Sequence, residues 1–230
     1  MNNKEIKLGF STGTLYKDLE TKRAIPVIKS LGCKYIELTV EEFWSDQLDR
    51  INEKDLEGFE YVSFHAPMVN YGKNSDTKKF FERMADFSKK VRLDLVVFHP
   101  DTVEDFSVFE NLDFNIGFEN MDNRKKSCKS VDDIESVMLR NNDFKFILDL
   151  NHCYTNDSSM KLALEFYERL GNRISQIHLS GFRELHDPLF ETEQLEIIRS
   201  IQSFDVPIIV ESLVNPETIV LERDYILQNI

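Results

Sequence analysis

Short β-branched and aromatic runs alternate with longer amphipathic stretches along the whole chain, and this alternation restricts the fold more than any other feature. Eight runs are typical of strands: 6–12, 34–40, 61–66, 95–99, 115–120, 144–150, 174–180 and 207–213. Helices are predicted near 18–31, 41–53, 77–92, 102–111, 131–141, 158–171, 190–203 and 216–228. Strands that are almost continuously apolar are buried on both faces, as in a parallel sheet. Eight strand-then-helix units predict a (β/α)8 barrel, an α/β fold.

The chain is long enough for such a barrel and shows no internal division. Its 230 residues contain no linker, low-complexity tract or shift in composition, and α/β barrels of similar length occur as single domains. We therefore expect one domain over residues 1–230. Function in this architecture collects at the carboxyl ends of the strands, so residues at those ends are the first candidates for a site.

Charge and cysteine content restrict the partners and the compartment. The formal net charge of -13 repels a polyanion such as DNA. The cysteines, Cys33, Cys128 and Cys153, are widely spaced and form no CxxC pair, so we expect no disulfide framework and a reducing cytoplasm. The start MNNKEIKLGF has no apolar signal core, and no apolar run approaches the roughly 20 residues that a membrane span needs. No membrane association is expected.

All five histidines lie at the end of a predicted strand or in the loop after one, and carboxylates occur in the same places. The strings are FHAP (His65), VFHP (His99), GFEN (Glu119), LDLNH (Asp149, His152), QIHLSG (His178), ELH (Glu184, His186) and IVES (Glu211). Each residue alone has an ordinary structural explanation, such as a helix cap or a hydrogen-bonded core group. Together, histidine and carboxylate are the ligand set of zinc and manganese. The sequence therefore predicts a metalloenzyme.

The order of these strings resembles a known family. FHAP, FHP, FEN, LDLNH, IHLSG, RELH and VES are similar to the motifs of the xylose isomerase-like TIM-barrel superfamily (AP endonuclease family 2). That superfamily includes endonuclease IV and the sugar isomerases and epimerases. The resemblance extends over essentially the whole chain and implies the same barrel fold.

The resemblance also implies a ligand set, for zinc or manganese. Isomerases and epimerases of this superfamily typically hold one metal with a Glu, an Asp, a His and a Glu, which match Glu119, Asp149, His178 and Glu211. Endonuclease IV-like members hold three zinc ions, and the added ligands match His65, His99, His152, Glu184 and His186. In that arrangement His65, His99 and Glu119 hold the first metal, Glu119 bridges to the second, and His152, Glu184 and His186 hold the third. One position departs from the pattern, because endonuclease IV has Asp where this chain has Glu184; Asp187 is an alternative ligand.

Two reactions suit these ligands, and a multinuclear site favours the first. An endonuclease IV-like phosphoester hydrolase would use two or three metals to supply a hydroxide and to stabilise the leaving oxygen. The alternative is a mononuclear isomerase or epimerase of a sugar or sugar phosphate, in which Glu119 and Glu211 are catalytic and exchange a proton with the substrate. A barrel that binds metal without turnover is a third class.

Substrate contacts are less determined by the sequence. Arg183 occupies a position where epimerases often bind substrate, and Ser11 and Glu37 end predicted strands; all three are candidate substrate-binding residues. The run Arg124 to Lys129 could face phosphate at the rim. We expect a small phosphorylated or sugar substrate, with abasic DNA disfavoured by the net charge.

Overall fold

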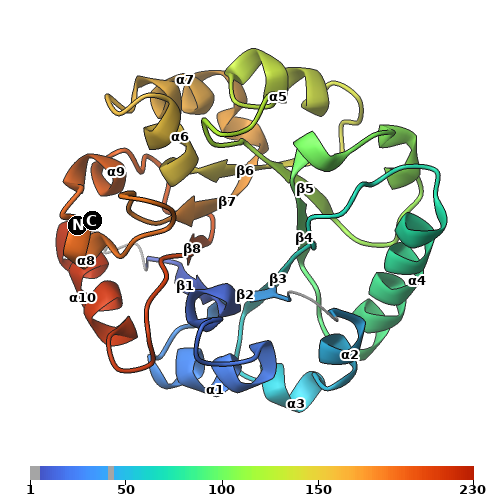
Figure 1. The fold of residues 1–230 in the computed structure, drawn as a ribbon, viewed down its shortest axis with the longest axis horizontal. Helices are drawn as coiled ribbons and strands as arrows, with labels where there is room; N and C mark the ends of the chain where they lie inside the picture. The colour runs from blue at the N-terminus through green and yellow to red at the C-terminus, as the bar shows by residue number, and fades with distance from the viewer. Residues whose placement is uncertain (1–5, 41–43) are drawn as a thin grey trace.

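The computed structural model describes residues 6–40 and 44–230, and its strands close into a barrel. All neighbouring strands are parallel and follow chain order, from β1 beside β2 round to β8 beside β1 (Figure 1). The strands are β1 (Leu8–Ser11), β2 (Tyr35–Thr39), β3 (Tyr61–His65), β4 (Leu95–Phe98), β5 (Ile116–Glu119), β6 (Lys145–Asp149), β7 (Ile174–Leu179) and β8 (Ile208–Val210). The predicted (β/α)8 barrel is confirmed, and each strand lies within its predicted run.

Helices surround the barrel (Figure 1). They are α1 (Thr21–Ser30), α2 (Trp44–Asp49), α3 (Glu53–Leu56), α4 (Ser75–Lys90), α5 (Val131–Met138), α6 (Leu150–Asn156), α7 (Lys161–Leu170), α8 (Leu189–Thr192), α9 (Leu195–Arg199) and α10 (Ile219–Asn229). Short 3-10 turns are η1 (Thr12–Leu15), η2 (Pro100–Thr102), η3 (Phe106–Phe109) and η4 (Gly171–Arg173). Residues 41–43 of the predicted helix 41–53 lie outside the described residues. Among the described helices none has the length and apolar character needed to cross a membrane.

The prediction of a helix over 102–111 is wrong. The chain there forms η2 and η3, separated by a segment that pairs with Tyr71. The Tyr71 amide donates to the Thr102 carbonyl, and the Glu104 amide donates to the Tyr71 carbonyl, at 3.0 and 2.8 Å. These bonds use backbone groups that a continuous helix would need for its own ladder. The predicted helix 190–203 is likewise split into α8 and α9, with Glu193 between them in the left-handed conformation.

The two faces of the barrel strands pack differently. Outward side chains such as Phe98 and Phe118 belong to the large apolar cluster that includes helix residues. Inward side chains Leu95, Val97 and Ile147 form a separate small cluster inside the barrel. Because side chains alternate along a strand, Glu119 and Asp149 share the inward face with their neighbours two positions earlier. This alternation directs the polar residues at the strand ends into the mouth of the barrel.

Beside the inner apolar cluster the barrel interior is polar, since Ser63 pairs in register with Leu95 and Gln176 with Ile147. Tyr61, Ser63, Glu37 and Gln176 form hydrogen bonds across the interior, from β3 to β2 and β7. The register aligns Asp149 of β6 with His178 of β7, and Thr39 of β2 with His65 of β3. The carboxyl ends of the strands therefore reach a common level, where the candidate site lies.

Candidate metal centre

Four of the predicted ligands meet at the mouth of the barrel. Glu119 ends β5, Asp149 ends β6, His178 lies in β7 and Glu211 follows β8. Each offers a ligand atom within 4.8 Å of those of the other three. All four side chains are buried or nearly so, and Glu211 is the most exposed at 15%. The group combines three carboxylates with one imidazole, a set that suits zinc or manganese.

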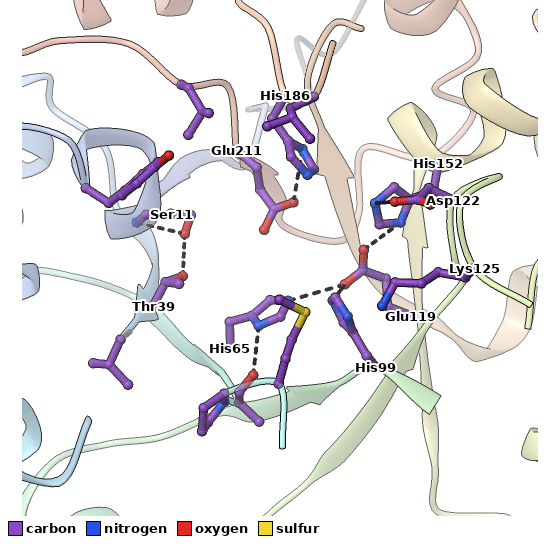
Figure 2. A pocket seen from close by; sticks show the side chains of 18 of the residues that line it. Ser11, Thr39, His65, His99, Glu119, Asp122, Lys125, His152, His186 and Glu211 are labelled. Atoms are coloured by element: carbon purple, nitrogen blue, oxygen red, sulfur yellow. Dashed lines mark hydrogen bonds and ion pairs between the residues drawn. The ribbon is translucent and has the colours of Figure 1, made fainter. Parts of the chain in front are cut away.

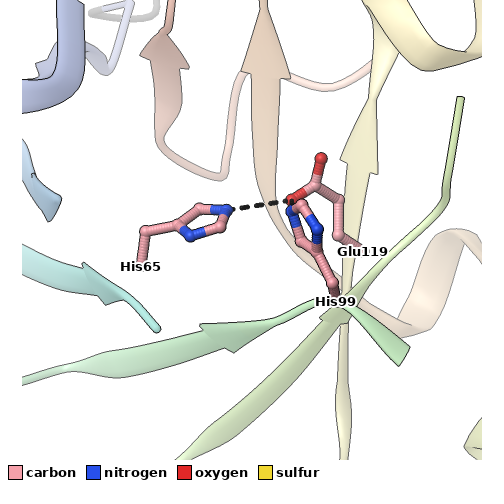
Figure 3. Close-up of side chains that lie close together, drawn as sticks. All are labelled: His65, His99 and Glu119. Carbon is pink, nitrogen blue, oxygen red and sulfur yellow. Dashed lines mark ion pairs between the residues drawn. The ribbon is translucent and has the colours of Figure 1, made fainter. Parts of the chain in front are cut away.

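Glu119 also belongs to a second group, with His65 and His99. Three imidazole nitrogens surround its Oε2 atom: Nε2 of His65 at 3.5 Å, Nε2 of His99 at 3.5 Å and Nδ1 of His178 at 3.4 Å. Figure 3 shows the two rings of His65 and His99 directed at this carboxylate. The ligand atoms of His65, His99 and Glu119 lie within 4.8 Å of one another. One carboxylate is therefore shared by two candidate ligand groups.

The residues fit a divalent cation on two independent counts. First, buried atoms that face the centre lack a hydrogen-bond partner, namely Glu119 Oε2, Asp149 Oδ2 and His178 Nδ1, although buried polar atoms are normally paired. Second, zinc ligands about 2.0–2.1 Å from a tetrahedral ion lie about 3.4 Å apart. The measured separations from His178 Nδ1 to Glu119 Oε2 and to Glu211 Oε2 are both 3.4 Å. These two separations match the spacing of ligands around one ion, and all four ligand atoms lie within 4.8 Å of one another.

Burial gives the carboxylates of the group different proton affinities. Burial raises the pKa of Asp149 to about 8 and that of Glu211 to about 7. Burial alone would also raise the pKa of Glu119, but the charge of His178 and the close imidazoles of His152 and His65 hold it well below its usual range. Glu119 is therefore ionised at neutral pH, whereas Asp149 and Glu211 hold protons near neutrality.

The histidines balance this charge. Burial alone would lower the pKa of His65, but the close carboxylate of Glu119 and those of Glu37 and Glu211 raise it to about 9. Burial likewise opposes protonation of His152, yet the charge of Asp149 and the hydrogen bond to Glu119 raise its pKa to about 10. Burial lowers the pKa of His186 to about 3. Protonated histidines thus supply the positive charge that neutralises the carboxylates. A bound cation would replace this charge, so its binding would release protons.

His152 and His186 lie beside the group, with their ring centroids 5.7 Å apart. The Nδ1 atom of His152 is 2.8 Å from the Asn120 carbonyl and 3.0 Å from Glu119 Oε1. The Nδ1 atom of His186 is 2.9 Å from the Ser180 hydroxyl. These two residues reach the cavity as expected.

The expected third ligand group is not assembled as the resemblance implied. Glu184 is exposed, and its side chain does not line the cavity. Asp187, the alternative ligand, accepts the backbone amides of Arg183, Glu184 and Leu185 with its Oδ2 atom. The short loop from 181 to 187 closes on Asp187, and this turns the Glu184 side chain to solvent.

Sequence reasoning missed Asp122, a further acid that the structure brings near His152, on the side of its Nε2 atom. Its side chain is only 4% exposed, and its Oδ2 atom lies 4.0 Å from His152 Nε2. Arg124 forms an ion pair with the same oxygen, and its backbone amide donates to Asp122 Oδ1 at 2.7 Å. The available signal was an acid in the loop directly after the β5 motif, where barrel sites collect.

Of the four-ligand group, Glu119 and Glu211 line a cavity of about 820 Å³, which His65, His99, His152 and His186 also line (Figure 2). Ser11 lines this cavity and shares a 2.6 Å hydrogen bond with Thr39. Two further substrate-binding predictions are not supported by position. Arg183 does not line the cavity, and its guanidinium donates to the Glu191 carbonyl. Glu37 is fully buried beneath His178, so it contacts a candidate ligand instead of the cavity.

Of the basic run after β5, Arg124 and Lys125 line the cavity. Lys125 forms a 2.9 Å ion pair with Asp101, and Arg124 pairs with Asp122. Apart from histidines, these are the cationic side chains among the described lining residues. Each is matched by an acid, so the rim on this side carries little net charge.

Comparison with solved structures finds the same architecture in several enzymes. The 3-keto-D-glucoside 4-epimerase YcjR from E. coli is 12% identical, with a TM-score of 0.64 over 97% of this chain and 100% of that chain. The IolI protein with a bound zinc atom is 14% identical, with a TM-score of 0.67 over 96% of each chain. The probable 3-DHS dehydratase AsbF from Bacillus anthracis is 13% identical, with a TM-score of 0.65 over 95% of this chain and 97% of that chain.

No family model matches the chain, and no curated protein matches it in sequence. At 12–14% identity the structural likeness concerns the fold and does not extend to activity. The shared architecture extends over nearly the full length of each compared protein, so the whole barrel is matched and not a part of it. The chain has the fold of the xylose isomerase-like TIM-barrel proteins.

Proposed function

We propose that this protein is a divalent-metal-dependent isomerase or epimerase of a small sugar or sugar phosphate. The observation that carries the proposal is the pair Glu119 and Glu211, whose Oε2 atoms each lie 3.4 Å from His178 Nδ1 at the floor of one cavity. Figure 2 shows the two carboxylates on different sides of the pocket, both directed toward its centre. The cavity volume of about 820 Å³ is sufficient for a monosaccharide or its phosphate.

The proton affinities of the two carboxylates support acid–base chemistry. The pKa of Glu211 is raised to about 7 by burial, whereas that of Glu119 is held low by His178 and its neighbours. Carboxylates whose environments separate their pKa values are suited to opposite roles in proton transfer. Glu211 and Glu119 would remove a proton from a carbon beside the substrate carbonyl and return one.

The remaining residues have roles consistent with this reaction. Glu119, Asp149, His178 and Glu211 would hold the cation, which when bound polarises the substrate carbonyl. Ser11 and Thr39 present hydroxyl groups to the cavity wall. The similar solved structures include a 3-keto-D-glucoside 4-epimerase and a D-psicose 3-epimerase, and reactions of this class require the same proton exchange.

Deuterium exchange tests the proposal without knowledge of the product. The protein would be loaded with zinc or manganese and incubated in D2O with a panel of ketoses, aldoses and their phosphates. We expect deuterium to replace a hydrogen beside the carbonyl of at least one sugar, as followed by NMR. The variant Glu211→Gln should abolish this exchange, while the control Glu217→Gln, at an exposed position, should retain it. Phosphate release without any exchange would contradict the proposal.

A second candidate, the metal-dependent phosphoester hydrolase, is favoured by one specific observation. His65, His99 and Glu119 form a second ligand group that shares Glu119 with the first, and two metals bridged by a carboxylate are suited to phosphoester hydrolysis. The double variant His65→Ala, His99→Ala separates the two candidates. If the protein is a hydrolase, the variant should lose about one equivalent of metal and its phosphoesterase activity. If it is an isomerase, the metal content measured by elemental analysis should stay at one.

A further inference from the structure

Glu37 is a carboxylate inside the barrel, beneath the candidate metal centre. It lies on β2 and is fully buried. Within residues 6–40 and 44–230 its ion-pair partner is His178, and no Lys or Arg is paired with it. Burying a carboxylate without a permanent cation is unfavourable, and replacing a buried ion pair as a whole by apolar side chains is often neutral or stabilising. This position therefore calls for an explanation other than folding.

The hydrogen bonds of Glu37 converge on one oxygen atom. Its Oε2 accepts from the Ser63 hydroxyl at 3.0 Å and from Gln176 Nε2 at 2.6 Å. The same oxygen lies 3.3 Å from His178 Nε2. The Tyr61 hydroxyl donates to Gln176 Oε1 at 3.0 Å, which fixes the amide of Gln176 with its nitrogen toward Glu37. The carboxylate is thus the common acceptor of this cluster.

The state of His178 depends on these contacts. Its Nδ1 atom faces Glu119 and Glu211 and has no hydrogen-bond partner. A proton on Nε2 would leave the Nδ1 lone pair free for a cation. The reverse arrangement is also within reach, because Gln176 Nε2 lies 2.7 Å from His178 Nε2 and could donate to it. Nδ1 would then carry the proton and be blocked as a ligand.

We infer that Glu37 is a positioning residue that holds the proton of His178 on Nε2 and so presents Nδ1 to the metal. A carboxylate can only accept, so it favours the Nε2–H form over the reverse arrangement. Acceptors of this kind behind a ligating histidine typically raise metal affinity by about 10–100-fold. The inference rests on the proposed function only in that the site binds a metal.

A graded pair of variants tests this role. Glu37→Gln keeps one acceptor oxygen, whereas Glu37→Met removes both at similar length. The probes are zinc and manganese alone, with dissociation constants measured by chelator competition on metal-free protein. We expect the constant to rise about 10-fold in Glu37→Gln and about 100-fold in Glu37→Met. The control Asp94→Asn, which makes the same change on a carboxylate that accepts the Val62 amide, should leave it unchanged.

Two further measurements distinguish positioning from simple structural support. The melting temperature of the metal-free protein should fall in Glu37→Met, since Ser63, Gln176 and His178 lose their acceptor, but a purely structural role would leave the metal dissociation constant unchanged. In the zinc-loaded protein, NMR should detect a slowly exchanging Nε2 proton on His178 that is lost in Glu37→Met. A lower melting temperature with dissociation constants within about twofold of wild type would overturn the inference.

The outcomes distinguish failure of the role of Glu37 from failure of the proposed function. If Glu37→Met does not fold, the shift in Glu37→Gln decides, because that variant preserves size and shape. A wild-type protein that binds neither cation overturns the proposed function and the role of Glu37 together. Binding by the wild type with equal affinity in the Glu37 variants overturns the role of Glu37 alone.

Discussion

Glu119 is the residue on which both candidate ligand groups depend. Its Oε2 atom faces three histidines, and its Oε1 atom lies 3.0 Å from His152. Removing it would therefore disturb every candidate cation position and every candidate reaction at once. Glu211 belongs to the four-ligand group alone, so its substitution reports on that group more specifically.

The substitution Glu211→Gln should weaken metal binding at the four-ligand group by at least about tenfold, because an amide keeps the shape but loses the charge that favours a cation. The control is Glu184→Gln, in which the same change falls on an exposed side chain outside the cavity. Elemental analysis and chelator competition would measure both variants. Equal loss of metal from the two would contradict the ligand assignment made from the structure.

Metal affinity should rise with pH between about 6 and 8. In the metal-free protein the pKa of Asp149 is raised to about 8 and that of Glu211 to about 7, both mainly by burial. Below these values the carboxyls hold protons that a cation must displace, so affinity falls as pH falls. Each displaced proton contributes about a tenfold change per pH unit. Zinc titrations at pH 6, 7 and 8 would check this, and a constant affinity would contradict it.

Most of the site residues could be found from the sequence because they end strands. The carboxyl ends of barrel strands converge, so His65, His99, Glu119 and Asp149 meet without any knowledge of the loops. Glu184 could not be placed in this way, because the direction of its side chain depends on a loop closed by hydrogen bonds to Asp187. Asp122 was missed for the same reason, because it too lies in a loop, whereas Arg124 and Lys125 were noticed as a basic run.

The strands were more predictable than the helices, and the cause is their burial. A strand between a ring of helices and a packed interior must be apolar on one face along its whole length, as Phe146 and Leu148 are in β6. The ends of some helices are instead set by tertiary contacts. The pairing of Val103 with Tyr71, for example, prevents a continuous helix over 102–111. The polar interior around Glu37 was also hidden, since pattern alone does not tell an inward carboxylate from one at the rim.

The pairing of β1 with β2 requires glycine at position 9, because a side chain there would collide with the backbone of β2. Gly9 pairs with Tyr35, and a Cβ atom built on Gly9 would lie 2.1 Å from the Tyr35 carbonyl oxygen. Gly9→Ala should therefore destabilise the protein by about 1–3 kcal/mol, since backbone must move. Gly171→Ala is the matched control, because no atom lies within 4 Å of its Cβ position and its φ of -54° suits alanine. Urea denaturation would measure the free energy of unfolding of both variants, and equal values would refute the steric argument.

At the scale of the whole molecule, the barrel concentrates acid in its mouth. The chain carries a net charge of -13, and Glu37, Glu119, Asp149 and Asp122 are all buried near the cavity. Protonated histidines balance part of this charge, but they are themselves buried at a cost. The free energy of unfolding of a protein is small, so the buried charges of this site lower the stability of the entire barrel by a significant fraction.

Metal removal should therefore lower the melting temperature of the whole protein. A cation at 100 times its dissociation constant stabilises a folded protein by about 2.7 kcal/mol if it does not bind the unfolded chain. For a chain of this size each kcal/mol corresponds to roughly 2–4 °C, so chelation should lower the melting temperature by roughly 5–11 °C. Scanning calorimetry of zinc-loaded protein with and without chelator would measure the shift. The Glu211→Gln variant should show a smaller shift, because it binds less metal at the same concentration. An identical melting temperature before and after chelation of a loaded wild-type protein would show that the cation does not bind at a site formed by folding.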